Sequence, residues 1–367
     1  MKAGWETKRL GEIIQLEYGK PLADSDRNPN GLYPAYGANG IKDRTDKFYK
    51  GELSIIVGRK GSAGEVTLTE EKYWPLDVTF FVEFDRAKYE LQYLYFLLLT
   101  LNLPSMAKGV KPGINRNDVY DITVATPDIE EQRRIVTLLD EAFADIATAK
   151  ANAEKNLQNA RELFTSHLQS VFTRQGLDWV VQPLGDIGKV SMCKRIFKEQ
   201  TTPTGDIPFY KIGTFGKEPD AFIPAEIYHQ FRQKYSFPNK GDVLVSAAGT
   251  VGRCVVYDGE DAYFQDSNIV WIANDQTKLL NHFLYHFYSA CDWNSTKGAT
   301  ISRLYNDNLR QIVIAFPQSL DEQNRIAAQL DVLSEKTNQL TDIYRQKLTA
   351  LDDLKKSLLH QAFSGQL

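Results

Sequence analysis

One stretch of the chain occurs twice, 191 residues apart, and this repeat constrains the fold more than any other feature. The first copy begins after Pro127 and the second after Pro317. The register is held over about 45 residues, pairing Glu131 with Glu322, Gln132 with Gln323, Arg134 with Arg325, Leu139 with Leu330, Leu163 with Leu354, Ser166 with Ser357, Leu168 with Leu359 and Phe172 with Phe363. Matches at a constant offset of 191 residues do not extend this far by chance, so the chain is a tandem duplication.

Both copies of the repeat are predicted to be long helices. Asp128 precedes Glu131, and Ser319 precedes Glu322, at the spacing of a capping box. Apolar side chains then recur at alternating steps of four and three, interrupted at Asn156 in the first copy and at Lys347 in the second. The predicted seams are Ile135, Leu139, Ala142, Ile146, Ala149, Ala153, Ala160, Leu163 and His167, and Ile326, Leu330, Leu333, Thr337, Leu340, Tyr344, Leu351, Leu354 and Leu358. Such seams are typical of helices that pack along their length, each roughly 60 Å at about 1.5 Å per residue.

The duplication extends to the segments before the helices. Trp5 recurs as Trp179, and the strand turn with Gly61 and Gly64 recurs with Gly249 and Gly252. We therefore predict an α+β fold, a tandem duplication of two mixed α/β modules joined by two long antiparallel coiled-coil helices. The predicted boundaries are 1–127 for the first module, 128–175 for the central helix, 176–317 for the second module and 318–367 for the C-terminal helix.

The charge of the chain is informative only in its distribution. The net charge is −4 at pH 7, spread evenly over the four segments, so no segment is basic overall. Acid-free runs nevertheless carry Lys108, Lys111 and Arg116 in the first module, and Lys297 and Arg303 at the matching place in the second. A third acid-free run holds Lys194 and Arg195. Local basic loops of this kind suffice to meet phosphates.

The compartment is predicted from the N-terminus and the cysteines. No apolar run precedes the first charges, so we expect no signal peptide. The apolar run 91–103 ends at Pro104 and is too short to span a bilayer, so no membrane is expected. Cys193, Cys254 and Cys291 are odd in number and lack metal-type spacing, which suits a reducing cytoplasm.

Catalytic motifs are mostly absent. The chain has no Pro-Pro pair, which the amino-group site of an adenine methyltransferase requires. His282 and His286 would share a helix face, but the sequence offers no matched carboxylate or third ligand, so we interpret them as packing residues and predict no metal. We expect no chemistry from this chain alone.

The tandem design, the Glu-Gln-x-x-Ile junctions at Glu131 and Glu322, the run from Tyr36 to Ile41 and the Gly-x-x-Gly turn resemble the specificity (S) subunit of type I restriction-modification systems. The resemblance implies two target recognition domains, each reading one half of a bipartite, asymmetric sequence in double-stranded DNA. It also implies helices that act as a ruler and as the platform for two adenine-N6 methyltransferase subunits, with ATP-dependent restriction subunits added in the full complex. S-adenosylmethionine, ATP and Mg²⁺ would then belong to the partner subunits, and this chain would hold no cofactor.

Candidate contact residues follow from loop position and hydrogen-bonding capacity. The DNA-binding candidates are Arg59, Lys60, Ser62, Lys108, Lys111, Asn115, Arg116 and Asn117 in the first module, and Lys194, Arg195, Lys297, Ser302, Arg303, Tyr305 and Asn306 in the second. The candidates for partner contact on the helices are Glu131, Gln132, Arg133, Arg134, Glu322, Gln323 and Arg325. The alternative interpretation is that these are ordinary solvated loops and helix faces.

Two other functions remain open at this point. The chain could be a two-headed scaffold that binds protein through both modules, which salt-sensitive binding to duplex DNA would contradict. It could also be a self-contained metal-dependent nuclease, which would require a carboxylate cluster with a lysine that the sequence does not place.

Overall fold

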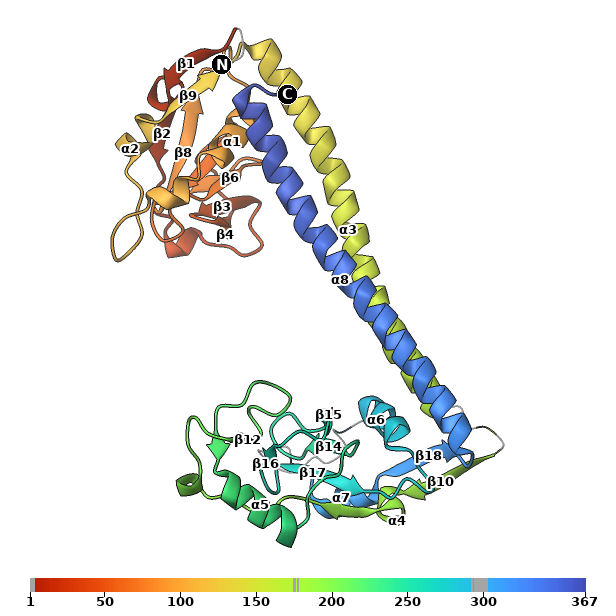
Figure 1. The fold of residues 1–367 in the computed structure, drawn as a ribbon. Coiled ribbons are helices and arrows are strands. Elements are labelled where there is room, and N and C mark those ends of the chain that lie inside the picture. Colours follow the sequence, from red (N-terminus) through yellow and green to blue (C-terminus); the bar gives the residue numbers. More distant parts are fainter. Residues whose placement is uncertain (1–3, 174–175, 177, 292, 294–302) are drawn as a thin grey trace. The chain divides into compact units, whose positions relative to one another are not determined.

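The structure, a computed structural model, describes residues 4–173, 176, 178–291, 293 and 303–367. It divides into two compact units, one formed by Met1–Glu154 with Arg345–Leu367 and the other by Lys155–Tyr344. Each unit combines one α/β module with parts of the two long helices, α3 (Ile129–Thr173) and α8 (Leu320–Ser364) (Figure 1). The predicted α+β duplication with two long packed helices is confirmed.

The module of unit one contains three small sheets. The central sheet is antiparallel, in the order β2-β8-β5-β6, and a second sheet, β4-β3-β7, pairs β3 antiparallel to β4 and parallel to β7. A two-stranded sheet, β1-β9, connects to the long helix. The strands are β1 Glu6–Arg9, β2 Ile14–Tyr18, β3 Tyr33–Gly37, β4 Gly40–Thr45, β5 Ile55–Gly58, β6 Val66–Leu68, β7 Trp74–Pro75, β8 Thr79–Phe84 and β9 Thr123–Thr126, with helices α1 Leu91–Thr100 and α2 Arg116–Tyr120.

The module of unit two repeats this topology sheet by sheet. Its antiparallel sheet has the order β11-β17-β14-β15, its mixed sheet the order β13-β12-β16, and its two-stranded sheet pairs β10 with β18. The strands are β10 Trp179–Pro183, β11 Lys189–Ser191, β12 Ile207–Tyr210, β13 Phe222–Ile223, β14 Val243–Ser246, β15 Cys254–Val256, β16 Tyr263–Phe264, β17 Ile269–Ala273 and β18 Val313–Pro317. The helices are α4 Leu184–Ile187, α5 Ala225–Lys234, α6 Asn281–Ala290 and α7 Asn306–Gln311. The duplication therefore survives as topology although the module sequences have diverged.

The long helices are part of both hydrophobic cores. In unit one, Ile135 and Leu139 of α3 and Ala362 of α8 join the core formed by α1 and the antiparallel sheet. In unit two, Leu168 of α3 and Ile326 of α8 join the equivalent core. Burial of these side chains stabilises each module on its helices by roughly 1.5–3 kcal/mol per large aliphatic side chain.

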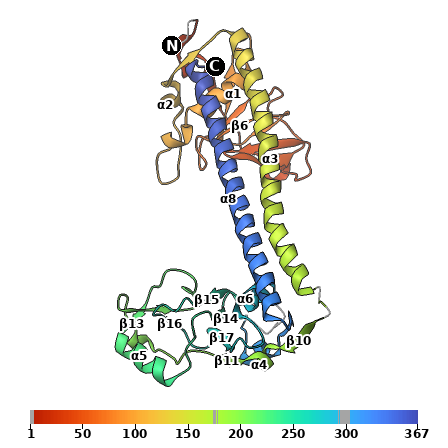
Figure 2. The same ribbon diagram turned by 45° about the vertical axis from the view of Figure 1, so that its right-hand side comes forward.

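Within unit one the two helices run antiparallel and side by side (Figure 2). Arg134, near the start of α3, donates to the backbone carbonyl of Leu367, and Lys150 pairs with Asp352 at 2.7 Å. The N-terminal part of α3 therefore lies beside the C-terminal part of α8.

Both helices begin with the predicted side-chain cap. The Glu131 backbone N–H donates to the Asp128 carboxylate at 2.9 Å, and that of Glu322 donates to the Ser319 hydroxyl at 3.3 Å. These caps satisfy N–H groups that have no partner inside the first helical turn.

The predicted seam is correct at Ile135, Leu139, Ile146, Ala153 and Ala160 of α3 and at Ile326, Leu330 and Thr337 of α8, and wrong at three later positions. Leu163, Leu340 and Leu354 were placed in the seams but are 53%, 39% and 46% exposed, whereas Leu168 and Thr341 are buried. An α-helix has 3.6 residues per turn, so a strict seven-residue pattern drifts by about 20° per heptad and neighbouring positions take over the buried stripe.

Candidate nucleic-acid interface

The first candidate surface is the turn between β5 and β6 in unit one. Gly61 and Gly64 have φ of +81° and +85°, values that glycine adopts without strain. At Gly58 a Cβ atom would lie 2.1 Å from the carbonyl oxygen of Ser62, so that position also requires glycine. The turn presents Arg59, Lys60 and Ser62 at the end of a buried strand, with Lys60 and Ser62 exposed.

The second predicted loop packs directly on this turn. The Gly61 N–H donates to the Pro112 carbonyl at 2.9 Å, and the Ile114 N–H donates to the Arg59 carbonyl at 3.1 Å. Lys108 and Gly113 close the loop through a pair of backbone hydrogen bonds. Two segments separated by about fifty residues in the sequence therefore form one loop cluster.

Tyr18, at the end of β2, belongs to this cluster and was not predicted. Its ring is 48% exposed, and the guanidinium groups of Arg59 and Arg116 lie 5.3 and 5.2 Å from its centroid. Tyr18 also packs on Phe80, with ring centroids 5.1 Å apart. The aromatic ring therefore holds two candidate arginines close together. A tyrosine at a strand end between charged residues gave no signal that distinguishes it from other surface tyrosines.

The candidates in unit one differ in how their polar groups are used. Lys108 pairs with Asp118 at 3.1 Å, and the Asn115 side chain caps α2 by accepting from the Asn117 N–H. Arg59 donates to the Asp77 carbonyl. Among the residues that the structure describes, Arg59, Lys60, Lys111 and Arg116 form no ion pair, so these four carry the cluster's uncompensated positive charge, while Asn117 keeps an exposed amide.

In unit two, the described residues on either side of the turn repeat part of this arrangement. The Leu304 N–H donates to the Ala247 carbonyl at 2.8 Å, which is the counterpart of the bond from Ile114 to Arg59. Gly249 and Gly252 again have positive φ, +65° and +87°. Arg303 lies beside Ala248 and donates to the Ser267 carbonyl at 3.3 Å.

The other candidates in unit two form a more varied set. Arg195 pairs with Asp266 at 2.9 Å, and the Lys194 ammonium lies 5.1 Å from the centroid of the Tyr235 ring. Tyr305 is 64% exposed at the N-cap of α7, and Asn306 is the first residue of that helix. Lys297 and Ser302 lie outside the described residues.

The start of each long helix carries the same exposed ion pair. Arg134 donates to both carboxylate oxygens of Glu131 at 2.6 and 2.8 Å, and Arg325 contacts Glu322 at 2.7 and 2.6 Å. These contacts raise the pKa of each arginine, and the arginine holds the Glu322 pKa below its usual value. Arg133 lies 3.6 Å from Glu90.

Gln132 and Gln323, predicted to contact partners, are instead completely buried. The Gln132 amide accepts from the Glu90 N–H and donates to the carbonyls of Lys88 and Pro127. The Gln323 amide likewise accepts from the Leu280 N–H at 2.8 Å, and it donates to the carbonyls of Lys278 and Pro317 at 2.8 and 2.7 Å. Both glutamines anchor helix to module, because each supplies partners to three backbone groups at its joint. They do not belong to the exposed surface.

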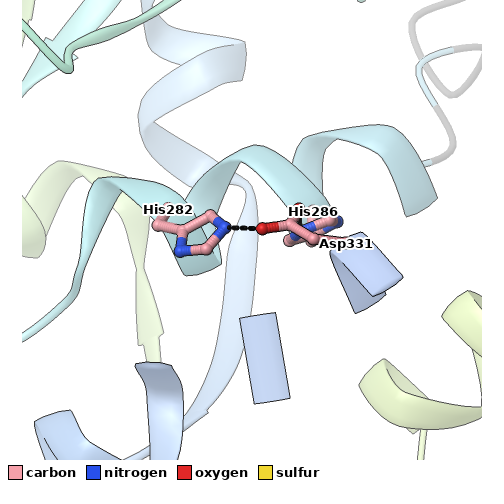
Figure 3. A group of neighbouring side chains, drawn as sticks. All are labelled: His282, His286 and Asp331. Carbon is pink, nitrogen blue, oxygen red and sulfur yellow. Dashed lines mark hydrogen bonds and ion pairs between the residues drawn. The ribbon is translucent and has the colours of Figure 1, made fainter. Parts of the chain in front are cut away.

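A correction also applies to the histidine pair of α6. The sequence offered no carboxylate for His282 and His286, but Asp331 of α8 contacts both rings (Figure 3). Asp331 is 49 residues beyond His282, and only the packing of α8 on α6 brings it there. The three side chains form a group of ligand type, with ligand atoms within 4.8 Å of one another.

The fold and these clusters define a class of protein, a duplicated DNA-recognition subunit with one loop cluster per module. The sequence matches the family described as the type I restriction modification DNA specificity domain over residues 2–157 and 176–350. The chain belongs to this family, and it is the DNA specificity subunit of a type I restriction-modification system. Subunits of this family specify the target of the complex and are not themselves catalytic.

Similar proteins support the assignment. A putative type I restriction enzyme specificity subunit of Haemophilus influenzae is 40% identical over 92% of this chain and 89% of its own. The EcoDI specificity subunit of Escherichia coli is 28% identical over 99% and 88%. Among solved structures, a chain from a study of complex assembly in the type I R-M system gives a TM-score of 0.78 at 19% identity, covering 100% and 99% of the two chains. The HsdS subunit of Thermoanaerobacter tengcongensis gives a TM-score of 0.64 at 19% identity, covering 100% of this chain and 98% of its own.

Within the described part of the chain, no helix combines the length and apolarity that crossing a membrane requires.

Proposed function

We propose that each module is a target recognition domain that reads one half of a bipartite, asymmetric sequence in double-stranded DNA. The observation that carries this proposal is the backbone hydrogen bond that recurs in both units, from Ile114 to Arg59 and from Leu304 to Ala247, beside turns that carry different side chains. Equivalent backbones present readout groups in the same way, and different side chains select different bases.

The domain boundaries follow from this assignment. Residues 1–127 and 176–317 form the two recognition domains, and 128–175 and 318–367 form the helices that set the gap between half-sites. In unit one, Lys60, Lys111 and Arg116 contact phosphates or guanine, with Arg59 and Tyr18 supporting Arg116. In unit two, Asn306 begins α7 as Arg116 begins α2, and Arg303 and Tyr305 flank Leu304, the counterpart of Ile114. Lys194 and Arg195 are further contacts of this module.

The partners are two adenine-N6 methyltransferase subunits, joined by ATP-dependent restriction subunits in the complete complex. The exposed pairs of Glu131 with Arg134 and Glu322 with Arg325, together with Arg133, support a repeated docking point at the helix starts. S-adenosylmethionine, ATP and Mg²⁺ serve the partner subunits. The complex acts in the cytoplasm, where cysteine thiols remain reduced.

Methylation sequencing tests the proposal in cells that express this chain with its methyltransferase. The expected result is a gapped adenine motif, and exchange of residues 1–127 for those of a relative should change one half of it. A substitution confined to the first cluster, Arg116→Ala, should weaken methylation through the same half-site. Absence of any motif while the methyltransferase is active would overturn the proposal and favour the protein-binding scaffold.

A further inference from the structure

The group formed by His282, His286 and Asp331 has the composition of a metal site. The two histidines are one helical turn apart on α6, and each places Nε2 against a different oxygen of the Asp331 carboxylate, at 2.6 and 2.9 Å. In Figure 3 a hydrogen bond joins His282 to the carboxylate, with His286 on its other side. Two imidazoles at i and i+4 with one carboxylate are a ligand set that binds Zn²⁺ in proteins.

The equivalent contact in unit one, between α1 and α3, shows that packing of α6 on α8 does not need histidine. At the matching place, Gln92 of α1 donates to Asp140 of α3 at 2.7 Å. Phe96 occupies the position of His286 and is buried against Phe143. The Gln92 amide and the Phe96 ring therefore fill the places that His282 and His286 take in unit two. Only the second copy brings two nitrogen ligands to its aspartate.

The surroundings of the rings suit metal binding. His286 is 2% exposed, so packing fixes its ring with Nε2 beside the Asp331 carboxylate. His282 and Asp331 are 41% and 51% exposed, which gives an ion and a completing water access from solvent. Mg²⁺ and Ca²⁺ prefer oxygen ligands, whereas imidazole favours Zn²⁺ and its neighbours.

The second nitrogen of His286 has a use in the metal-bound form. Its Nδ1 is buried and finds no hydrogen-bond partner within the described chain. When Nε2 binds an ion, the imidazole proton is carried by Nδ1, so the two ring nitrogens have separate roles.

We propose that His282 Nε2, His286 Nε2 and a carboxylate oxygen of Asp331 bind one divalent transition-metal ion of the Zn²⁺ class, with water completing the coordination. Zn–N bonds of about 2.0–2.1 Å place tetrahedral ligands about 3.3 Å apart, so the present nitrogen–oxygen separations must lengthen by several tenths of an ångström. Half-exposed His282 and Asp331 side chains can make that adjustment. The bound ion ties the second recognition module to α8 more firmly than two hydrogen bonds do.

The test compares the full-length chain, without a polyhistidine tag, with two variants. Each protein is freed of metal with a chelator, kept under a phosphine reductant and titrated with Zn²⁺ against a competing chromophoric chelator. One variant, H282Q/H286F, installs the pair found at Gln92 and Phe96; the other is Asp331→Asn. We expect one tightly bound ion per wild-type chain, its loss in the double variant and at least tenfold weaker binding in Asp331→Asn.

The controls separate this site from other ligands in the chain. The double variant keeps all three cysteines and the other histidines, so an ion that it retains with wild-type affinity would overturn the proposal. Unchanged affinity in Asp331→Asn would overturn it as well. If the double variant does not fold, the single substitution His282→Gln at the exposed ring takes its place, with the same expected loss. Millimolar Mg²⁺ should not displace the ion, and displacement by Mg²⁺ would contradict the assigned metal class.

Discussion

The ring of Phe363, at the end of α8, packs against Tyr93 of α1 with centroids 5.1 Å apart. Phe172, its counterpart in the first repeat, packs in the same way against Phe283 of α6 at 5.2 Å. The module before each long helix therefore receives the C-terminal end of the other helix. Unit one is completed by the last residues of the chain, and unit two by the end of α3.

This exchange predicts which unit each aromatic residue stabilises. Phe363→Ala should lower the stability of unit one, and Phe172→Ala that of unit two, each by roughly 2–4 kcal/mol because a large contact in a packed core is lost. Hydrogen exchange measured by mass spectrometry, resolved by unit, reports the difference. Leu163→Ala on α3, at a half-exposed position, serves as the control. Equal loss of protection in both units from either substitution would contradict the assignment.

The buried glutamines should matter more for stability than their polar character suggests. Gln132→Ala and Gln323→Ala each leave three backbone groups at a joint without their partner, one of them buried, so each should cost at least about 2 kcal/mol of unfolding free energy. Urea unfolding of the full chain measures the loss. Gln339→Ala, an exposed change on α8, should stay within about 0.5 kcal/mol of wild type. If Gln132→Ala is as mild as that control, the anchoring role is wrong.

The glycines of the first loop cluster give a matched pair. A Cβ at Gly61 would meet open space, so Gly61→Ala should cost about 1 kcal/mol from its positive φ alone. A Cβ at Gly64 would lie 2.4 Å from backbone atoms of Leu103 and Pro104, so Gly64→Ala should cost more than about 2 kcal/mol and displace the turn. Thermal unfolding and DNA affinity are the measurements. Equal effects of the two substitutions would show that the turn is not held against Leu103.

Two kinds of DNA contact should be separable in the first module. Lys111→Ala should weaken binding to all duplexes similarly and reduce the slope of log affinity against log salt by about one unit. Arg116→Ala should also relax selectivity at one half-site, at about 1–3 kcal/mol, and Tyr18→Ala should act in the same direction by releasing Arg116. Lys336→Ala, on the exposed face of α8, is the charge-matched control. A salt slope that falls as much with Lys336→Ala would contradict local contact by Lys111.

The repeated ion pairs at the helix starts should contribute to assembly and little to folding. Arg134→Ala and Arg325→Ala remove exposed pairs, so each should change stability by less than about 1 kcal/mol. Co-purification with the methyltransferase should nevertheless fall for each, because the pair lies on the proposed docking point. Thr148→Ala, an exposed change in the middle of α3, should leave assembly intact. If both arginine variants assemble normally, the helix starts are not part of the surface that binds the methyltransferase.

The sequence predicted the fold because its repeat carries long-range information. A constant offset identified both modules, and the caps at Asp128 and Ser319 located the helix starts. The drift of the buried stripe to Leu168 was missed because a strict 4-3 pattern assumes supercoiling along the whole helix. Burial of Gln132 was missed for another reason. A polar residue on the first turn of a helix gives no sign that module backbone will surround it.

The sequence predicted which loops form the candidate site, but not all of the residues that pack around them. The sequence identified both loops of the first cluster, and matching glycines identified the turn in the second. Tyr18 and Asp331 were missed because each reaches its neighbours only through tertiary packing, across 98 residues to Arg116 and 45 residues to His286. No local pattern reports such distances. The bases recognised by each module depend on side-chain positions relative to DNA, which sequence patterns do not specify.

The side-chain hydrogen bonds of Gln132 and Gln323 go to main-chain groups of the modules. Peptide groups are identical in every sequence, so these hydrogen bonds impose no requirement on the side chains of the domain they hold. A lineage can therefore replace surface residues of a module without compensating changes at either glutamine. New target specificity can arise in this way while both joints stay constant.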